Sequence, residues 1–386
     1  MKYNKRIVFL DQYGSLGGGQ QVLLELVLAA QALFCDVAVI IPKGSCADRL
    51  TSMGVHVENT DECRLTCGTK SFFDILRFVG NGLRVFFQKL KLLKTADVIY
   101  VNGNRLLPVA LLSMIFLNKK AAFHIHLNHT NLEKSIFSRV IMFRNTAAVV
   151  APSEFIRDQL CQFSPHFNSP KLRLVENGLD SRFTQVAFKD RFSDRPIRHI
   201  GIVGRISPEK GQDVLPALAR QFSDLTFHVL GDAAFSEKTY EDRLRAESPA
   251  NVVFHGWVEN LPAKVDEIGL QVCIIPSRCP EATPGRSFEA APLVPLQQIA
   301  MGCMVAVRSL GSLEYIARDL SLPSFHEDQD IPGCLQSMLQ TPAAELARQC
   351  RQRYDTVMAQ HCHAAFQQRL RALLAGLCGV RDTTTR

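Results

Sequence analysis

The stretch "RIVFLDQYGSLGGGQQVLLELVLAAQAL", residues 6–33, indicates how this chain folds. Its first part, "RIVFLDQ" (6–12), is a short run rich in branched and aromatic side chains, which favours a buried strand. The glycines that follow open an amphipathic helical stretch, and "CDVAVIIP" (35–42) is the next strand-like run. A strand, a helix and a second strand in this order predict a βαβ unit with parallel strands.

The same alternation continues outward from this unit. "ADVIYVNG" (96–103) and "AAFHIHL" (121–127) predict further strands, and "AAVVAPSEFIRDQL" predicts a strand followed by a helix with Ser153 as its N-cap. After a polar stretch, a second series begins with the strand "RHIGIVGRI" (198–206) and a helix over 209–222. The sequence therefore predicts an α/β protein with two doubly wound, Rossmann-like domains.

The expected domain boundaries follow that polar stretch. We expect an N-terminal domain over residues 1–180, a linker over 181–197 and a C-terminal domain over 198–365. Residues 366–386 should form a terminal helix and tail that pack back on the N-terminal domain. With 386 residues, 47% of them hydrophobic, the chain has enough apolar material for two cores of ordinary size.

The composition indicates which partners the protein could bind and in which compartment it works. The formal net charge of +7 is modest, which suits an anionic substrate or membrane surface and gives no reason to expect a nucleic-acid partner. The opening "MKYNKRIVFLDQYG" has too few consecutive apolar residues for a secretory signal. The 12 cysteines include no CxxC pair, which indicates reduced thiols. We expect a cytoplasmic protein.

Several segments together carry a family resemblance. They are "GIVGRISPEKG", "VVFHGWV", "IIPSR" and "EAAPLVPLQQIAMGCMVAVRSLGSLEYI", preceded in the same order by "LGGGQQVLLELVLAAQAL" and "APSEFIRDQL" with "VENGLD". In these segments, which span nearly the whole chain, the protein resembles the retaining GT-B glycosyltransferases of family GT4. This group is typed by sucrose synthase and by bacterial lipopolysaccharide mannosyl- and glucosyltransferases. The resemblance implies two domains facing a cleft, with a UDP- or GDP-sugar donor on the C-terminal domain and the acceptor on the N-terminal domain.

Two cations lie at or after the end of the first strand of the C-terminal domain. Arg205 lies at its carboxyl end, and Lys210 lies at the mouth of the next helix. Because ligands bind at the carboxyl ends of strands in such sheets, both side chains are candidates for contact with a ligand. Fixed cations can neutralise a diphosphate leaving group in place of a metal. The resemblance implies this role for both and a donor contact at Gly204; without it, solvated loop cations would be the simpler interpretation.

The segment "FEAAPLVPLQQIAMG" departs from the family's pattern. That pattern is a glutamate, seven residues, a second glutamate and, five residues later, a glycine. Counting back from Gly302 places Glu289 first and Gln297 second, with Gln298 where the family has alanine. The resemblance implies that Glu289 lies by the sugar and that position 297 holds the ribose hydroxyls. A second register pairs Glu281 with Glu289 but lacks the matching glycine, so an insertion before the motif is the simplest explanation.

An amide at position 297 changes the strength of the expected contact. Its oxygen can still accept a hydrogen bond from a ribose hydroxyl, but it lacks the charge that makes such bonds about twice as strong. We expect weakened or altered donor binding rather than the loss of the site. The resemblance also implies donor or cleft contacts at further positions, which are Gly17, Gly18, Gly19, Leu293, Val294 and Ser312.

Histidines and aspartates supply two more candidate groups. His124, His126 and His129 follow an N-domain strand; the resemblance places one histidine near the transferred sugar, and His126 matches best, with His124 second. For any single one, an ordinary structural histidine is an equally open interpretation. Asp328 and Asp330 precede an expected helix, where acidic residues complement the helix dipole, so we predict no metal site there. No cofactor beyond the donor is expected.

One basic and apolar stretch indicates contact with a membrane. Residues 77–94, "RFVGNGLRVFFQKLKLLK", carry five basic side chains and no acidic one, and residues 134–144 are a second candidate. Basic amphipathic helices lie on anionic bilayers. An ordinary surface helix packed on the sheet is equally open. A saccharide or lipid-linked acceptor at the inner face of the cell membrane would suit this location.

The sequence therefore predicts a metal-independent, retaining hexosyltransferase, with a role in bacterial polysaccharide, lipopolysaccharide or glycolipid synthesis. One alternative is a non-catalytic GT-B-like subunit that binds nucleotide-sugar, which Gln297 favours. A dinucleotide-dependent oxidoreductase is a weaker alternative, because it predicts GxGxxG and an acidic residue about twenty residues later. The loop "GSLGGG" lacks that spacing, although glycines before a helix can still admit a phosphate to the helix N-terminus.

Overall fold

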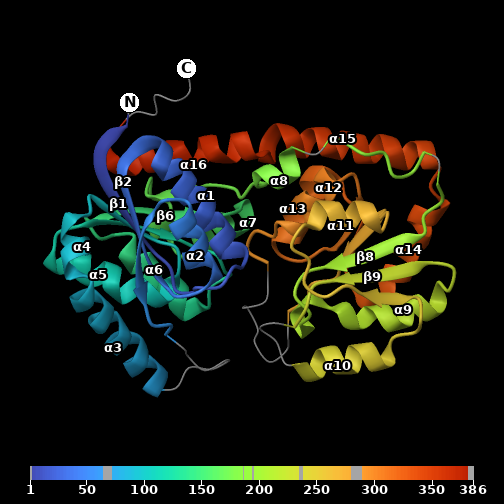
Figure 1. Cartoon of the computed structure of the whole chain (residues 1–386), viewed down its shortest axis with the longest axis horizontal. Coiled ribbons are helices and arrows are strands. Elements are labelled where there is room, and N and C mark those ends of the chain that lie inside the picture. The colour runs from blue at the N-terminus through green and yellow to red at the C-terminus, as the bar shows by residue number, and fades with distance from the viewer. Residues whose placement is uncertain are drawn as a thin grey trace. The chain divides into compact units, whose positions relative to one another are not determined.

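The computed structural model describes residues 2–63, 72–185, 187–193, 195–233, 238–279 and 289–380. The chain divides into two compact units, of which the first is Met1–Asn177 with Phe366–Arg386 and the second is Gly178–Ala365. Each unit contains one parallel sheet flanked by helices (Figure 1). The prediction of two doubly wound, Rossmann-like domains is confirmed.

The first unit is built on a seven-stranded sheet with the order β3-β2-β1-β4-β5-β6-β7. Its strands are β1 (Tyr3–Leu10), β2 (Phe34–Pro42), β3 (His56–Thr60), β4 (Val98–Val101), β5 (Lys120–His124), β6 (Thr146–Ala151) and β7 (Leu172–Leu174). Ile7 of β1 pairs with Val37 on one side and Val98 on the other. The order of the strands reverses between β1 and β4, which is the point where sheets of this type bind ligands.

Helices cover this sheet and bury a continuous core against it. They are α1 (Gly18–Leu33), α2 (Ser45–Ser52), α3 (Phe72–Gln88), α4 (Leu90–Thr95), η1 (Asn104–Leu106), α5 (Leu107–Phe116), α6 (Asn131–Val140), α7 (Glu154–Phe163), η2 (Pro165–Phe167) and α16 (His363–Cys378). Ser153 caps α7 through a hydrogen bond from the Ile156 N–H, as predicted. Among the helices that the structure describes, none has the length and apolarity of a membrane span.

The C-terminal helix α16 belongs to the first unit although its sequence follows the second. Leu370 and Leu374 are fully buried in the same cluster as Leu23 of α1. The Gln367 side-chain amide also donates to the backbone carbonyl oxygen of Glu25 at 3.0 Å. The helix therefore stabilises the N-terminal sheet.

The second unit repeats the same topology with six strands in the order β10-β9-β8-β11-β12-β13. They are β8 (His199–Val203), β9 (Thr226–Leu230), β10 (Val252–Phe254), β11 (Val272–Ile275), β12 (Met304–Arg308) and β13 (Ser324–Phe325). The helices are α8 (Ser181–Thr184), η3 (Pro208–Lys210), η4 (Gln212–Val214), α9 (Leu215–Gln221), α10 (Lys238–Glu247), α11 (Leu261–Glu267), α12 (Val294–Ala300), α13 (Ser312–Leu320), η5 (Asp328–Asp330), α14 (Ile331–Gln340) and α15 (Ala343–His361). Its switch point lies between β8 and β11.

Two stretches of the second unit have a structure that the sequence analysis did not describe. The stretch predicted as a linker packs into this unit, since Phe192 and Ile197 are buried in its core. The single helix predicted over 209–222 is instead two 3-10 turns followed by α9. Gly211 adopts the left-handed conformation with φ of 69° between the two turns, which interrupts the helical hydrogen bonds.

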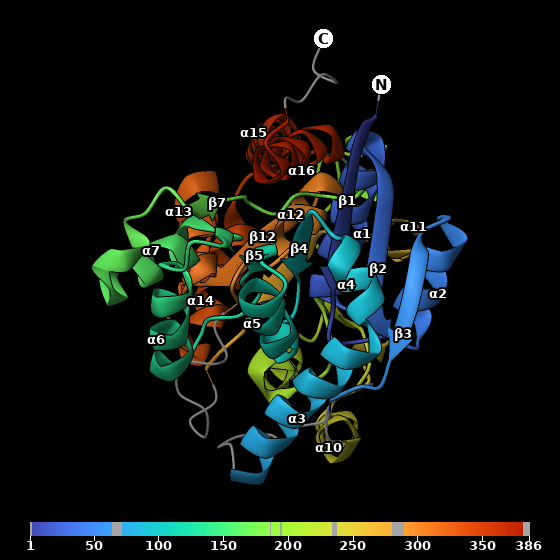
Figure 2. The same cartoon turned by 90° about the vertical axis from the view of Figure 1, so that its left-hand side faces the viewer.

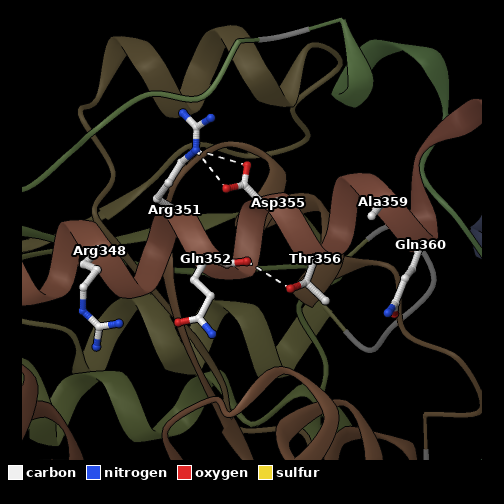
Figure 3. A pocket seen from close by; sticks show the side chains of 7 residues that line it. All are labelled: Arg348, Arg351, Gln352, Asp355, Thr356, Ala359 and Gln360. Atoms are coloured by element: carbon white, nitrogen blue, oxygen red, sulfur yellow. Dashed lines mark hydrogen bonds and ion pairs between the residues drawn. The ribbon is translucent and has the colours of Figure 1, made fainter.

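The surface of α15 carries a shallow hollow that the sequence did not predict (Figure 3). Arg351 and Asp355 pair along its edge, with 3.1 Å between Nε and Oδ1. None of the predicted site residues lines it. The residues that do so are Arg348, Arg351, Gln352, Asp355, Thr356, Ala359 and Gln360.

Candidate active site

In each unit, several predicted site residues lie close to the carboxyl ends of strands at the switch point or next to it. In the second unit, Arg205 follows β8, and Glu289 contacts Ser277, which follows β11. In the first unit, the glycine loop follows β1, and His126 lies just beyond β5. This is the edge at which parallel α/β sheets bind ligands.

The second unit pairs two of the predicted residues directly. The Lys210 ammonium and the Glu289 carboxylate form an ion pair, although the residues are far apart in the sequence. Lys210 ends the turn η3, and Gly211 after it has φ of 69°. A Cβ at Gly211 would lie 2.5 Å from the carbonyl oxygen of Pro276, so glycine allows this turn to close on the end of β11. The turn thereby holds the Lys210 side chain within contact distance of the Glu289 carboxylate.

Two serines fix the position of Glu289. The Ser277 hydroxyl donates to Glu289 Oε1 at 3.2 Å, and the Ser312 hydroxyl donates to the Glu289 backbone carbonyl. Ser312 is the first residue of α13. It was predicted to lie near the site, and in the structure it contacts Glu289. The sequence analysis missed Ser277. Its signal was a polar residue directly after the buried strand β11 and Pro276.

The electrostatic surroundings keep the Glu289 carboxyl ionised. Burial alone would raise the pKa of this carboxyl. The Lys210 ammonium, the Ser277 hydroxyl and the charge of Arg205 outweigh burial and hold the pKa below its usual value. Glu289 therefore carries a negative charge at neutral pH, and Lys210 provides the compensating positive charge.

Arg205 lies on the same loop as Lys210 but has a different carboxylate partner. It follows Gly204 and pairs with Glu209 inside the turn. Its side chain is 39% exposed, against 24% for that of Lys210. Because each cation already contacts a carboxylate, the two pairs together are neutral. An incoming diphosphate must therefore share these cations with Glu209 and Glu289 or displace the carboxylates.

A small pocket lies beside the Lys210–Glu289 pair. The residues that line it are Ile202, Val203, Lys210, Ile275, Pro276, Ser277, Glu289, Pro292 and Val294. Val294 begins α12 and was predicted, whereas Leu293 just before it is half-buried and does not line the pocket. Among the described residues that line the pocket, Lys210, Glu289 and Ser277 have polar or charged side chains and the others are apolar.

The two glutamines of α12 differ in environment. Gln297 is half-buried and does not line the small pocket. Gln298 is fully buried, and neither its amide oxygen nor its amide nitrogen has a hydrogen-bond partner among the residues that the structure describes. Glu281, the partner of Glu289 in the second register, lies outside the described residues. The choice between the two registers therefore stays a prediction.

The first unit assembles a buried polar cluster at its own switch point. Asp11 follows β1, Asn102 follows β4, and His126 lies just beyond β5, so neighbouring strands bring them together. The Asn102 amide nitrogen donates to Asp11 Oδ2 at 2.6 Å and to the Gly19 carbonyl oxygen at 3.0 Å. The Asn102 amide oxygen lies 2.7 Å from His126 Nε2. The sequence analysis missed Asp11 and Asn102.

These contacts determine which nitrogen of His126 carries the proton. The Gly19 carbonyl can only accept, so it fixes the nitrogen of the Asn102 amide on its own side and turns the oxygen toward His126. A neutral His126 must then donate from Nε2, which leaves Nδ1 as an acceptor. Burial, with a smaller contribution from His129, lowers the pKa of His126 to about 4. The imidazole is therefore neutral at pH 7.

The other two histidines are more deeply placed. His124 is 1% exposed, stacks on His126 with ring centroids 4.2 Å apart, and lies 3.0 Å from the Tyr100 hydroxyl. His129 is buried and lies 3.6 Å from the Glu133 carboxylate. His126 is only half-buried, which favours it over His124 for contact with a ligand.

The glycine loop leaves open space at the start of α1. Gly17 precedes the helix, and a Cβ at Gly18 would meet no atom within 4 Å. A Cβ at Gly19 would lie 3.6 Å from the nearest carbon of His126, which is ordinary contact. Packing among the residues that the structure describes therefore does not require glycine at position 18. Gln20 follows and donates to Asp11 Oδ1 at 2.9 Å, which ties the loop to the cluster.

The two aspartates of "HEDQD" have structural roles in the second unit. Asp328 pairs with Arg308 and lies 3.4 Å from Arg278, while Asp330 accepts from the Glu327 N–H at 2.8 Å before α14. Within the described ranges, no group of three or more His, Cys, Asp or Glu side chains could hold a metal ion. Asp330 supports the start of the turn η5, whereas Asp328 contacts arginines and caps no helix that the structure describes.

Comparison with known proteins identifies the family. The family model described as Glycosyltransferase Family 4 matches residues 16–183, and that described as Glycosyl transferases group 1 matches residues 197–331. This chain belongs to glycosyltransferase family 4. The prediction of a glycosyltransferase is confirmed, and the oxidoreductase alternative is set aside. No curated protein sequence matches the chain.

Solved structures show that this family 4 glycosyltransferase has the GT-B fold. HepE from Anabaena in complex with UDP-glucose has a TM-score of 0.76 at 18% identity, covering 96% of this chain and 99% of HepE. Sucrose-phosphate synthase from Thermosynechococcus elongatus has a TM-score of 0.72 at 15% identity, and the match covers 97% of this chain and 100% of the synthase. A glycosyltransferase from Rickettsia africae has a TM-score of 0.72 at 16% identity, and the match covers 97% of this chain and 98% of that protein. At these identities the likeness establishes the fold alone.

Proposed function

We propose that this glycosyltransferase moves a hexose from a UDP-sugar, with a GDP-sugar as the second choice, to a saccharide or lipid-linked acceptor with retention of anomeric configuration. The observation that carries the proposal is the Lys210–Glu289 pair, held by Ser277 beyond β8 and β11 in the unit that matches the group 1 model. HepE, of the same fold, has been solved with UDP-glucose, which supports the uridine nucleotide.

In this proposal the second unit binds the donor. Lys210 and Arg205 stabilise the negative charge that grows on the diphosphate as the bond to the anomeric carbon breaks. Glu289 orients the sugar hydroxyls, and Gln297 accepts from the ribose. Because Glu289 is ionised and paired, its carboxylate accepts hydrogen bonds from sugar hydroxyls and has no proton of its own to donate. The remaining donor contacts that we propose are Gly204, Leu293, Val294 and Ser312.

The first unit contributes a hydrogen-bond acceptor and an open loop. His126 presents Nδ1 as an acceptor, which suits a hydroxyl of the transferred sugar, and Asn102 with Asp11 sets that tautomer. The space at Gly18 allows a phosphate or sugar to approach the start of α1, where helix N–H groups favour negative charge. We propose that Gly17, Gly18 and Gly19 serve this purpose.

The reaction breaks the bond between the anomeric carbon and the diphosphate oxygen and forms one to the acceptor oxygen. The acceptor hydroxyl gives its proton to the leaving diphosphate, on the same face of the sugar. Retaining glycosidases instead use two carboxylates about 5 Å apart. In this chain, Glu289 is held by Lys210 rather than by a second acid, which supports the phosphate-assisted route. The two cations take the place of a divalent metal.

We place the reaction in the cytoplasm, at the inner face of the cell membrane, in bacterial polysaccharide, lipopolysaccharide or glycolipid synthesis. A screen of thermal stability with UDP-, GDP-, ADP- and TDP-sugars tests the donor. We expect the largest rise in melting temperature with a UDP-sugar, because bound ligand stabilises the native state. NMR of the product then gives the anomeric configuration. Donor binding without any sugar release would favour the non-catalytic alternative, and no binding of any of the four would contradict the proposal.

A further inference from the structure

The helix α3 carries large apolar side chains on the face that points to solvent. Figure 2 shows it at the periphery of the first unit, beside α5. Seven of its large apolar side chains are exposed, which are Phe72 (69%), Phe73 (70%), Ile75 (53%), Leu76 (51%), Val79 (45%), Leu83 (40%) and Phe87 (66%). Soluble proteins rarely expose so many together, and such patches mark interaction sites.

These side chains form a stripe opposite the buried side of the helix. Positions 72, 76, 79, 83 and 87 follow the three- and four-residue spacing that places residues on one face of a helix. The other side of the helix packs inward through Asp74, Gly82 and Val85, and Phe86 is buried beside the stripe, seven residues after Val79. A Cβ at Gly82 would lie 2.4 Å from Cβ of Pro108, so glycine brings α3 close against α5. The inner face is therefore already satisfied, and the outer stripe has no partner in the part of the chain that the structure describes.

The charges beside the stripe indicate the occupant. Arg77 and Arg84 are exposed and seven residues apart, so they lie along one edge of it. The acid within α3, Asp74, is buried. Two copies joined through this face by a two-fold axis would place these arginines near their equivalents, which is unfavourable. Phe and Leu on one face with Arg on its edge is the composition of helices that lie in the interface of anionic bilayers.

The structure also shows which basic residues of this region are already paired. Lys89 pairs with Glu58 at 3.0 Å and is 15% exposed, and Arg84 pairs with Asp61 at 2.9 Å. Asp61 is itself 76% exposed, so the second pair is a weak surface contact that phosphates can replace. Lys89 is therefore unavailable, and we assign the electrostatic contact to Arg77 and Arg84.

We propose that the outer face of α3 docks the protein on a lipid bilayer with anionic headgroups. The apolar stripe enters the boundary between headgroups and acyl chains, and Arg77 and Arg84 contact lipid phosphates. The helix lies in the plane of the interface and does not cross the bilayer. The proposed function gives this contact its purpose, access to a lipid-linked acceptor, but the contact itself does not require donor or transfer.

Flotation of the full chain with vesicles tests the proposal. We compare vesicles of phosphatidylcholine alone with an equimolar mixture of phosphatidylcholine and phosphatidylglycerol, and expect binding mainly to the second. Leu83→Gln with Phe87→Gln should reduce binding at least about tenfold, because two apolar side chains that enter the bilayer are replaced by polar ones. Leu28→Gln on α1 is the matched control, because Leu28 and Leu83 are both 40% exposed. It should bind like the wild type.

Charge variants separate the two parts of the contact. Arg77→Gln with Arg84→Gln should remove most of the preference for the anionic vesicles. Unchanged flotation of the Leu83→Gln, Phe87→Gln variant, with the melting temperature of the control, would overturn the proposal. So would a wild type that binds neither vesicle but forms a dimer that this variant abolishes. Release of UDP from a UDP-sugar in solution should be equal in all these variants, so a failure of docking is distinguishable from a failure of the proposed function.

Discussion

The hydrogen bonds of Asn102 predict a defined protonation state for His126, and replacing Asn102 by leucine tests it. Asn102 is 3% exposed and makes three contacts, at 2.6 Å to Asp11, 3.0 Å to the Gly19 carbonyl and 2.7 Å to His126. A neutral hydrogen bond contributes about 0.5–1.5 kcal/mol and one to a charged group about 1.5–3 kcal/mol. Asn102→Leu should therefore lower the free energy of unfolding by about 3–5 kcal/mol, measured by urea denaturation.

The chemical consequence is read by NMR of protein labelled with 15N in its histidines. In the wild type, the His126 signals should show a proton on Nε2 and a bare Nδ1 at pH 7, because Asn102 accepts from Nε2. Asn102→Leu removes that acceptor and should give a mixture of tautomers. Asn104→Leu is the matched control, since Asn104 contacts His129 at 3.1 Å and should leave His126 unchanged. A wild-type His126 protonated on Nδ1 would refute the reasoning.

Other contacts give further predictions. Gln297→Glu should tighten binding of UDP about tenfold, because a charged hydrogen-bond acceptor is stronger than a neutral one, and Gln297→Leu should weaken it, because leucine offers no acceptor. Calorimetry measures both affinities. Tight binding of UDP by Gln297→Leu together with weak binding by Glu289→Gln would support the register that pairs Glu281 with Glu289. His228 is 5% exposed, and burial, with smaller effects from two neighbouring histidines, lowers its pKa from the ordinary 6.5 to about 4. The unfolded chain binds more protons in this window, so His228 alone should lower the free energy of unfolding by about 3 kcal/mol as the pH drops from 6.5 to below 4, in addition to the loss that His126 contributes. His228→Phe should reduce the wild-type slope by that share, and a slope equal to that of the wild type would exclude a contribution from His228. Gln298→Leu should stabilise the protein by about 1–2 kcal/mol in thermal or urea unfolding, because it removes a buried amide with no partner in the described structure, and a loss of stability would point to a partner for the amide.

The alternation of strands and helices was readable from the sequence because parallel strands buried on both faces form short apolar runs. The first βαβ unit appears within about three residues of its expected limits, with β1 at Tyr3–Leu10 and β2 at Phe34–Pro42. The helix expected over 209–222 failed because one residue, Gly211, takes a left-handed conformation that packing against Pro276 imposes. The glycine itself is a local stop signal that the sequence analysis did not use.

Part of the site was also readable. The position of Arg205 at the end of a strand was readable because a charged side chain stands out against an apolar run, and the family resemblance singled it out from other polar residues at strand ends, such as Asp11. The pairing of Lys210 with Glu289 was not, since it joins segments far apart in the sequence, and the cluster of Asp11 and Asn102 needs the order of β1, β4 and β5 in the sheet. The buried state of Gln298 was equally hidden, because a polar residue in a helix gives no sign of burial.

The most direct test of the account is the release of UDP by Lys210→Ala from the UDP-sugar that stabilises the wild type most. We expect wild-type release to persist in EDTA, and the variant to be at least about 100-fold slower, the effect of losing one preorganised charge partner. Lys264→Ala is the control, since Lys264 pairs with Glu267 at 2.6 Å on α11 and should leave the rate unchanged. Full activity of Lys210→Ala, or loss of wild-type activity in EDTA, would contradict the account.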